Sequence, residues 1–159
     1  MKNRAAVILA IAILACFMGA CSRKASFREY AVDKVCDTEP RVRITKITVT
    51  DKDTRVNFKY EYKSRSASLQ PGTKEALTLA PPGNADALTI VADGSGRKYL
   101  LLRVEGIPTL PDHVFLQEGS VVEFILIFER LDDTVRKINI VEKATGMDIT
   151  WQFLNIQLQ

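Results

Sequence analysis

The side chains that most often perform catalysis are scarce in this sequence of 159 residues. It contains one histidine, His113, which follows Asp112 in a proline-flanked segment. A Ser-His-Asp or Cys-His arrangement would have to be assembled around that imidazole, with Cys36 as the thiol. No nucleophile-elbow or similar local motif accompanies these residues, and the supply of ligands is thin for zinc, which needs three or four. The sequence therefore predicts no catalytic residue, no metal site and no cofactor, and we expect His113 in an exposed loop.

Acidic residues in three loops raise the question of calcium. These loops contain DKD at 51–53, DGSG at 93–96, and the pair Asp132 and Asp133. Calcium needs six to eight oxygen ligands from converging groups. None of the three stretches has the spaced ligands and closing glutamate of a calcium loop, and hairpin tips are rich in Asp and Gly for backbone reasons. We therefore interpret all three as turns.

The remaining side chain with identifiable chemistry is Cys21, which ends an apolar segment. Two basic residues among the first four precede an uncharged apolar run of 14 residues, 5–18, and the small residues Gly19 and Ala20 follow. This order is typical of a secretory signal peptide. The run is shorter than the roughly 20 residues that a transmembrane helix needs. The pattern therefore predicts a cleaved signal over residues 1–20 rather than a permanent span.

The residues MGAC at 18–21 resemble the lipobox of bacterial lipoproteins, in which an aliphatic residue and two small residues precede the lipidated cysteine. Met18 departs from that pattern, since leucine is commonest there. A second frame, ILAC ending at Cys16, leaves a shorter apolar region and places Leu14 where a small residue is usual, so the frame ending at Cys21 is favoured.

The lipobox resemblance implies lipid attachment at Cys21 and cleavage between Ala20 and Cys21. A lipoprotein cysteine carries two acyl chains on its glyceride and usually a third on its amine. Each buried methylene contributes about 0.8 kcal/mol, so such an anchor would be effectively permanent. The implied location is the bacterial cell envelope. Ser22 and Arg23 lack the aspartate that marks inner-membrane retention in some Gram-negative lipoproteins, which favours the outer membrane.

Residues 21–40 are predicted to form the lipidated cysteine and a tether. They mix charged residues with few adjacent apolar ones and end at Pro40. A flexible coil of this length would separate its ends by roughly 25 Å. A short helix around residues 27–35 is an alternative, because several apolar residues there fall near helical spacing.

Cys36 is the one thiol left once the signal is removed and Cys21 is lipidated, so no disulfide can form within the chain. We expect Cys36 to be a small buried apolar residue. The alternative is a disulfide to another chain, because an unpaired thiol in an oxidising compartment can form one.

From residue 41 the hydrophobic pattern alternates with a period of two, which predicts strands with one buried face. The residues 54–63, TRVNFKYEYK, show it most clearly, and TDKDT before them predicts a hairpin. In RVRITKITVT the alternation changes parity near Thr45, which predicts a bulge. The apolar segment 120–129 should run through the centre of its sheet. Further strands are expected at 75–80, 86–92, 97–104, 113–116, 134–142 and 149–158.

The C-terminal half has an order of segments that resembles a known type of domain. The segments are DGSGRKYLL, GIP, GSVVEFILIFERL, DDTVRKINIVE and WQFLNIQL. They are similar to small lipoprotein and envelope domains of an uncharacterised family with an immunoglobulin-like β-sandwich. The resemblance covers residues 41–159 and implies an all-β antiparallel sandwich of about seven to nine strands. It transfers no active-site residue, because such sandwiches host unrelated functions.

Charge is nearly balanced outside the signal, which holds two of the 22 basic residues and none of the 19 acidic ones, leaving +1. Nothing in that balance indicates a nucleic-acid partner. Residues 41–65 are locally basic, with eight basic and three acidic residues. If Arg43, Lys59 and Lys63 share an outward face, they could meet anionic lipid or glycan. The preferred interpretation is a solvated sheet face.

Two function classes remain open from the sequence. The first is a lipid-anchored, non-enzymatic binding or accessory module that faces the periplasm or the cell surface, with an envelope protein or glycan as partner. The second is a lipid-anchored enzyme or small-ligand carrier whose site is assembled from scattered residues. A deep cavity with convergent polar groups would support the second class, whereas a packed core with a flat apolar patch would support the first.

Overall fold

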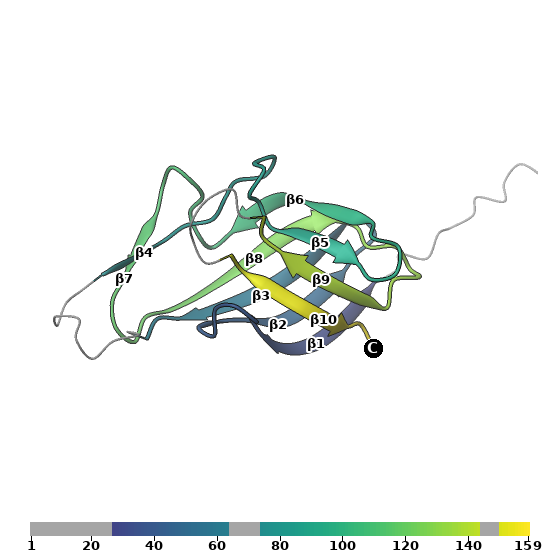
Figure 1. Ribbon diagram of the computed structural model, residues 1–159, viewed down its shortest axis with the longest axis horizontal. Helices are drawn as coiled ribbons and strands as arrows, with labels where there is room; N and C mark the ends of the chain where they lie inside the picture. The colour runs from purple at the N-terminus through teal and green to yellow at the C-terminus, as the bar shows by residue number, and fades with distance from the viewer. Residues whose placement is uncertain (1–26, 64–73, 144–149) are drawn as a thin grey trace, which may run out of the picture.

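The computed structural model describes residues 27–63, 74–143 and 150–159 (Figure 1). These residues form ten strands and no helix, so none of the described segments could cross a membrane as a helix. Ala20 and Cys21 lie outside the described residues. The strands are β1 (Arg28–Val35), β2 (Val42–Val49), β3 (Asp53–Glu61), β4 (Glu75–Leu77), β5 (Thr89–Ala92), β6 (Lys98–Glu105), β7 (Val114–Leu116), β8 (Val121–Glu129), β9 (Lys137–Val141) and β10 (Gln152–Gln157).

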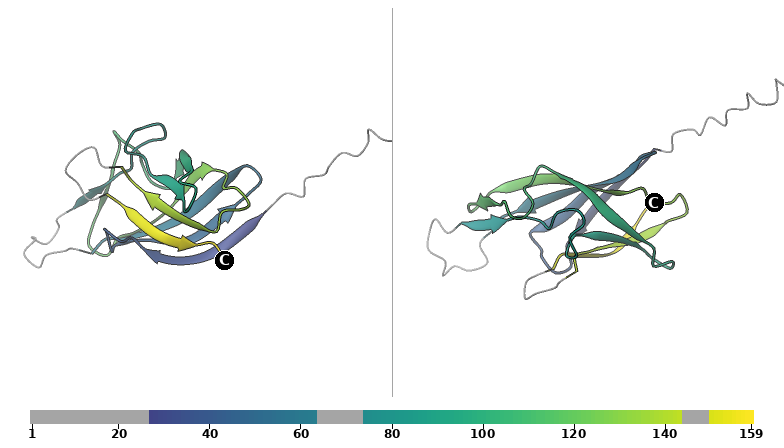
Figure 2. Two further views of the ribbon diagram at one scale, coloured as in Figure 1. Left: turned by 45° about the vertical axis from the view of Figure 1, so that its right-hand side comes forward. Right: turned by 90° about the horizontal axis from the view of Figure 1, so that it is seen from above.

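Eight strands form one antiparallel sheet in the order β1-β2-β3-β8-β6-β5-β9-β10, and the sheet curls until its two edges meet (Figure 2). The junction is made by residues just after β1. The amide of Asp37 donates to the carbonyl of Gln152 over 2.7 Å, and the amide of Leu154 donates to Asp37 Oδ2 over 2.7 Å. The sheet is therefore nearly closed, and β4 and β7 pair with each other as a separate arm at one end (Figure 1).

The prediction of an all-β antiparallel fold is confirmed, and each of the nine predicted strand segments overlaps an observed strand. The residues between β2 and β3 form the expected hairpin, in which the amide of Thr50 donates to the carbonyl of Asp53. The pairing of these strands shifts register between Ile44 and Lys46, which confirms the bulge at Thr45. β8 lies between β3 and β6, as its two-sided apolar pattern predicted.

Residues 28–35 contradict the sequence analysis, because they form strand β1 rather than a tether or a helix. β1 pairs with β2 from Arg28 opposite Val49 to Val35 opposite Arg43. Its side chains alternate between half-buried and exposed, and Tyr30 packs against the core. The period-two signal in REYAVDKV is weak, because the half-buried face includes Arg28 and Lys34 and the exposed face includes Ala31 and Val35. The stretch between Cys21 and the sheet is therefore only residues 22–27.

The core lies between the two halves of the curled sheet. Phe58 of β3 stacks on Phe124 of β8 with ring centroids 5.2 Å apart, and meets Phe153 of β10 edge-on at 5.5 Å. The contact between Phe58 and Phe153 joins opposite halves of the sheet, whereas Phe58 and Phe124 lie on adjacent strands. At the exit of β6, a Cβ on Gly106 would lie 2.9 Å from the carbonyl oxygen of Glu123, and Gly106 has φ +86°. A glycine is therefore required where this turn crosses β8.

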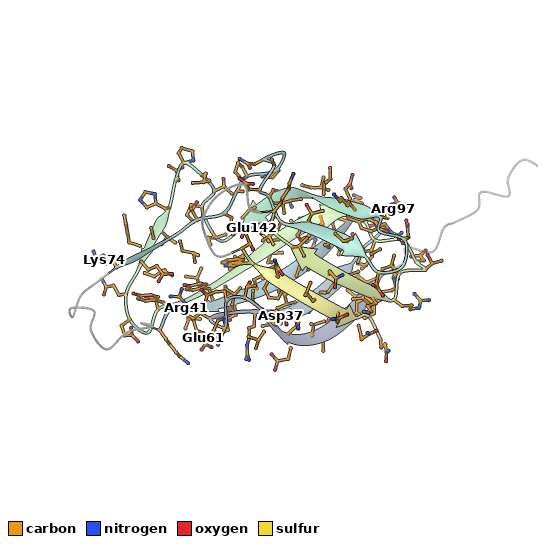
Figure 3. The ribbon with its side chains drawn as sticks, in the orientation of Figure 1. Asp37, Arg41, Glu61, Lys74, Arg97 and Glu142 are labelled. Atoms are coloured by element: carbon orange, nitrogen blue, oxygen red, sulfur yellow. The ribbon has the colours of Figure 1, made fainter. Side chains whose placement is uncertain are left out.

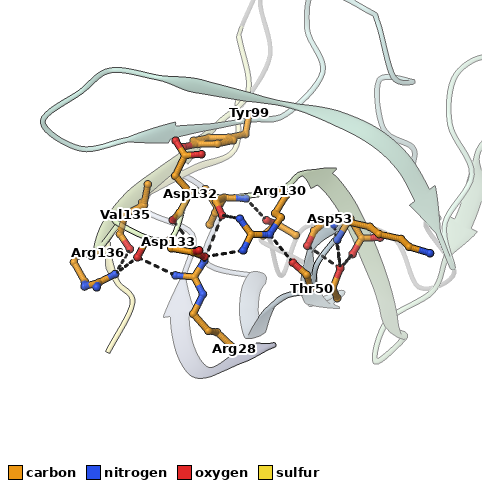
Figure 4. A network of polar contacts seen from close by, with 12 residues as sticks. Arg28, Thr50, Asp53, Tyr99, Arg130, Asp132, Asp133, Val135 and Arg136 are labelled. Atoms are coloured by element: carbon orange, nitrogen blue, oxygen red, sulfur yellow. Dashed lines mark hydrogen bonds and ion pairs between the residues drawn. The ribbon is translucent and has the colours of Figure 1, made fainter. Parts of the chain in front are cut away.

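The start of β1 is held by an arginine network, which comprises Arg28, Arg130, Asp132 and Asp133 (Figure 4). Arg28 donates to the carbonyl of Leu131 over 3.3 Å and forms an ion pair with Asp133 at 3.1 Å. Arg130 pairs with the same carboxylate at 2.7 Å. The network thus ties β1 to the segment that follows β8.

Candidate functional site

A cavity of about 540 Å³ lies at the opposite end of β1 from the arginine network, where β1 ends and β2 begins. We call it the end cavity. Its volume falls within the range of small-molecule sites. Figure 3 labels Arg41 and Glu142 in its wall, and Arg97 at the other end of the molecule. The lining residues are Glu39, Arg41, Tyr60, Glu75, Ala76, Leu77, Thr78, Leu79, Glu142 and Trp151.

Arg41 and Glu39 form a buried ion pair in the wall of the end cavity. The Arg41 Nε donates to Glu39 Oε1 and Nη2 donates to Glu39 Oε2, both over 3.0 Å. The side chains of Glu39 and Arg41 are 4% and 12% exposed. Hydrogen bonding to Glu39 is the main cause that raises the pKa of Arg41 further above its usual value. The guanidinium therefore stays charged and fixed in a planar, bidentate contact.

Glu75 links this ion pair to the sheet core. Arg41 Nη1 donates to Glu75 Oε2 over 2.7 Å, and the Tyr60 hydroxyl donates to Glu75 Oε1 over 2.7 Å. Burial is the main cause that raises the pKa of Tyr60, and its hydrogen bond to Glu75 raises it further. The phenol is therefore a permanent donor. Because Glu75 begins β4, these two bonds also attach the β4–β7 arm to β2 and β3.

Trp151 and Glu142 form the side of the end cavity that comes from β9 and β10. Trp151 stacks on Tyr60 with ring centroids 6.3 Å apart. The Trp151 amide donates to Glu142 Oε2 over 3.0 Å, and the Glu142 amide donates to the Trp151 carbonyl over 3.0 Å. Burial raises the pKa of the Glu142 carboxyl, and the charge of Asp86 adds to this effect.

The lining of the end cavity combines charged, aromatic and hydroxyl-bearing side chains. Its described residues include three carboxylates, one guanidinium, a phenol, an indole and the Thr78 hydroxyl, which donates to the carbonyl of Asp112 over 2.6 Å. The described lining residues include no histidine and no cysteine. Across the described residues, no three His, Cys, Asp or Glu side chains are grouped closely enough to hold a metal ion.

A second hollow of about 400 Å³ lies beside the bulge at Thr45 and the turn at Gly106. We call it the outer hollow. It also contains Glu105 and Glu123. Glu105 is held by Arg103 at 2.7 Å. The polar groups of the outer hollow do not form a joint network like that of the end cavity, so the end cavity is the stronger candidate.

The residues singled out in the sequence do not meet in the end cavity. Cys36 is buried, and its thiol donates to the carbonyl of Gln152 over 3.3 Å. The expectation of a buried cysteine is therefore confirmed. His113 is exposed beside β7, where its ring meets Phe115 edge-on at 4.7 Å. It lies in an exposed loop, as expected.

The acidic loops proposed as turns are engaged by cationic side chains. Asp132 accepts from Arg97 over 2.6 Å and from the Tyr99 hydroxyl over 3.0 Å. Asp53 accepts from Arg55, and Asp93 pairs with Lys137 at 3.1 Å. These carboxylates therefore serve the hairpin ends in which they lie.

The basic segment 41–65 does place Arg43 and Lys59 directly opposite each other, in paired positions of β2 and β3. However, β1 supplies acidic partners to this face. Arg43 pairs with Asp33 at 3.2 Å, and Lys46 pairs with Glu29 at 3.5 Å. Lys59 and Lys63 both pair with Glu61. The local excess of positive charge is therefore largely compensated, which favours the solvated-face interpretation.

Sequence reasoning missed every charged member of the end cavity except Arg41, which it counted only as part of the basic segment. The other three, Glu39, Glu75 and Glu142, lie at strand ends or just outside them, in three distant parts of the chain. One usable signal was Tyr60, whose position at the end of a clearly alternating strand placed a polar hydroxyl on the buried face and required a partner.

Comparisons of this chain with protein-family models, with curated proteins and with solved structures found no match.

Proposed function

We propose that this protein is a bacterial lipoprotein, anchored through lipid at Cys21 in the cell envelope with the outer membrane favoured, and that its domain is a non-enzymatic binding module. The observation that carries the binding role is the end cavity with its convergent aromatic and charged side chains. The partner would be a component of the envelope that reaches this end of the domain.

The course of β1 supports an outward-facing cavity. Only residues 22–27 separate Cys21 from Arg28, and six residues span at most about 20 Å. The arginine network would therefore lie close to the lipid headgroups. β1 then runs for eight residues, or roughly 25 Å, away from that point. The end cavity lies beyond the far end of β1, on the side that a partner can approach.

The immunoglobulin-like sandwich belongs to the same proposal. Its support is the way in which the two halves of the curled sheet face each other across the core, with β6 pairing to β8 over one part of its length and to β5 over the other. The contact between Phe58 and Phe153 spans the two halves. Such a two-layer arrangement is the packing expected of a sandwich.

The anchor is tested by replacing Cys21 with alanine. We expect Cys21→Ala to leave the membrane fraction or to stay unprocessed, and to lose label from a radioactive fatty acid. Cys16→Ala is the matched control and should still be labelled. Fatty-acid labelling that persists in Cys21→Ala would refute the anchor.

The binding role is tested in intact cells with a photoreactive amino acid at Ala76, an exposed residue that lines the end cavity. We expect crosslinking to a discrete envelope component. The same group at exposed Lys52, in the β2–β3 hairpin at the anchor end, is the control and should not capture that component. Identical capture from both positions, or none from Ala76, would contradict a binding site at this end.

A small-ligand carrier is the second candidate function, and the volume of the end cavity favours it specifically. The crosslinking experiment separates the two, because a carrier would yield a low-mass adduct at Ala76 whereas a module for protein recognition would yield a higher-mass complex.

A further inference from the structure

We infer that the end cavity recognises an ammonium or guanidinium group, with the Glu142 carboxylate as its counter-ion and Trp151 as its aromatic wall. This inference rests on the proposed binding function and names the chemistry of the ligand. The group could belong to a free small molecule or to a basic side chain of a polypeptide, and the test below separates these sources.

The charges of the lining favour a cation. Glu39, Glu75 and Glu142 outnumber Arg41, the one basic residue among the described lining residues. Arg41 is already engaged, because each of its three nitrogens donates to Glu39 or Glu75 and its side chain is 12% exposed. An anionic ligand would therefore meet uncompensated negative charge, whereas a cation would reduce it.

Glu142 is the carboxylate of the lining that is least engaged. Within the described part of the chain, one of its oxygens accepts from the Trp151 amide, and no cationic side chain pairs with it. Glu39 and Glu75, in contrast, both bond Arg41. Asp86 lies near enough to add negative potential at Glu142. A bound cation would thus supply the partner that this half-buried carboxylate lacks.

The aromatic side chains match the same ligand. Trp151 and Tyr60 line the end cavity beside Glu142 and Arg41. Tyr60 is 1% exposed and its ring already lies 5.3 Å from the Arg41 guanidinium, so Trp151 is the ring of this lining that would meet a ligand. The face of an aromatic ring attracts cations within about 6 Å, and the attraction is larger where water is excluded.

The sole tryptophan of the chain reports on the site directly, because Trp151 is in its wall. The full chain, held in neutral detergent, is titrated with N-acetylarginine amide while Trp151 emission is recorded. N-acetylcitrulline amide is the matched probe, since it has nearly the same shape but no charge. We expect a saturable change with the arginine probe and none with the citrulline probe over the same concentrations.

Glu142→Gln is the test variant. We expect it to raise the Kd of the arginine probe about tenfold or more, because it removes one member of a desolvated charge pair. Glu123→Gln, which removes a carboxylate of the outer hollow, is the matched control and should bind as the unaltered protein does. Equal binding of both probes, or undiminished arginine binding by Glu142→Gln, would overturn the inference.

The source of the cation is separated by comparing N-acetylarginine amide with a blocked Gly-Arg-Gly peptide and with agmatine. Tighter binding of the peptide assigns the site to a polypeptide, and tighter binding of agmatine assigns it to a small molecule. If neither binds and Trp151 does not respond to the arginine probe, the inference is wrong. Capture of a partner from Ala76 in cells would then still support the proposed function, so the two can fail separately.

Discussion

At the end of the sheet where β1 begins, Asp132 and Asp133 are each bound by at least one arginine, whereas at the other end carboxylates outnumber the guanidinium. In the arginine network, Arg28 and Arg130 share Asp133, and Arg97 holds Asp132. In the end cavity, Arg41 holds two carboxylates and Glu142 has no cationic partner among the described residues. The paired charges of the first end hold strands together, whereas the second end retains an excess of negative charge.

Buried charges thus have two roles in this domain: at one end they hold the chain in place, and at the other they can bind a ligand. A network in which each carboxylate has a cationic partner fixes the path of the chain. A cavity whose charges are unbalanced lowers stability slightly but can gain free energy from a ligand. If this comparison is correct, substitutions at the two ends should divide into those that change stability and those that change the response to a cation. The four predictions below follow from it.

The largest effect should come from Glu39→Gln, because this change leaves the buried Arg41 with one carboxylate instead of two. Breaking a buried ion pair on one side costs about 3 kcal/mol or more. Urea unfolding followed by Trp151 fluorescence measures the loss. The control is Glu61→Gln on the outer face, where solvent screens the ion pairs and the loss should be much smaller. If Glu39→Gln lowers the free energy of unfolding no more than the control does, the Glu39–Arg41 pair is not desolvated.

The next effect should come from Thr54→Val near the arginine network. Thr54 is fully buried, and its Oγ1 accepts from the amide of Leu131 over 2.9 Å. Valine has nearly the same shape but leaves that amide unpaired, so we expect a loss of about 2 kcal/mol in the free energy of unfolding.

Thr54→Val also sharpens the comparison, because the arginine probe should still change Trp151 emission as it does in the unaltered protein. Thr45→Val, at an exposed bulge, is the control and should have little effect on stability. Loss of the probe response in Thr54→Val would mean that the two ends are coupled rather than independent.

The sequence pattern predicts most of the strands but not the charged contacts between them. Strands followed from the period-two pattern because each of them buries one face, and that is a local property. Even the bulge at Thr45 was visible as a change of parity. β1 was missed because its outward residues, such as Glu29 and Asp33, are charged partners for β2, and this role depends on a pairing that the local pattern does not encode.

The end cavity was beyond sequence reasoning for a related reason. Glu39, Glu75 and Glu142 are separated by 36 and 67 positions in the printed sequence, and only closure of the sheet brings them to one wall. Isolated glutamates at strand ends look like ordinary solvated residues. Their meeting depends on the order of strands across the sheet, which the hydrophobic pattern does not specify.

A smaller effect is expected from Asp37→Asn at the junction of β1 and β10. Asp37 bonds Lys34 over 2.8 Å and accepts from the Leu154 amide. The hydrogen bond from Lys34 is the main cause that lowers the pKa of Asp37. Its ionised form therefore stabilises the folded state above the unfolded pKa, and that stabilisation is lost as pH falls through the folded pKa.

Asp37→Asn should accordingly unfold about 1 kcal/mol more easily at neutral pH. The difference should shrink as pH falls through the folded pKa of Asp37, because the aspartate of the unaltered protein is then protonated as well. Urea unfolding at neutral pH and in acid measures it. Asp33→Asn, which changes an exposed partner of Arg43, is the control and should show little difference at either pH. A constant difference across pH would mean that Asp37 contributes through shape and not through charge.

The smallest effect on stability, and the opposite pH dependence, should come from Glu142→Gln. Burial raises the pKa of Glu142, and the charge of Asp86 raises it further, against the hydrogen bond from the Trp151 amide. The ionised carboxylate therefore disfavours the folded state. The stabilisation that Glu142 gives the folded state is fully present below its unfolded pKa and is lost as pH rises through its folded pKa.

Glutamine keeps an oxygen that can accept from the Trp151 amide and removes the charge. We expect the variant to be equal to or slightly more stable than the unaltered protein at neutral pH, by less than about 1 kcal/mol, with no difference in acid. Urea unfolding at both pH values measures this gain. A variant that is less stable at neutral pH would place Glu142 among the structural charges, and the distinction between the two ends of the sheet would not hold.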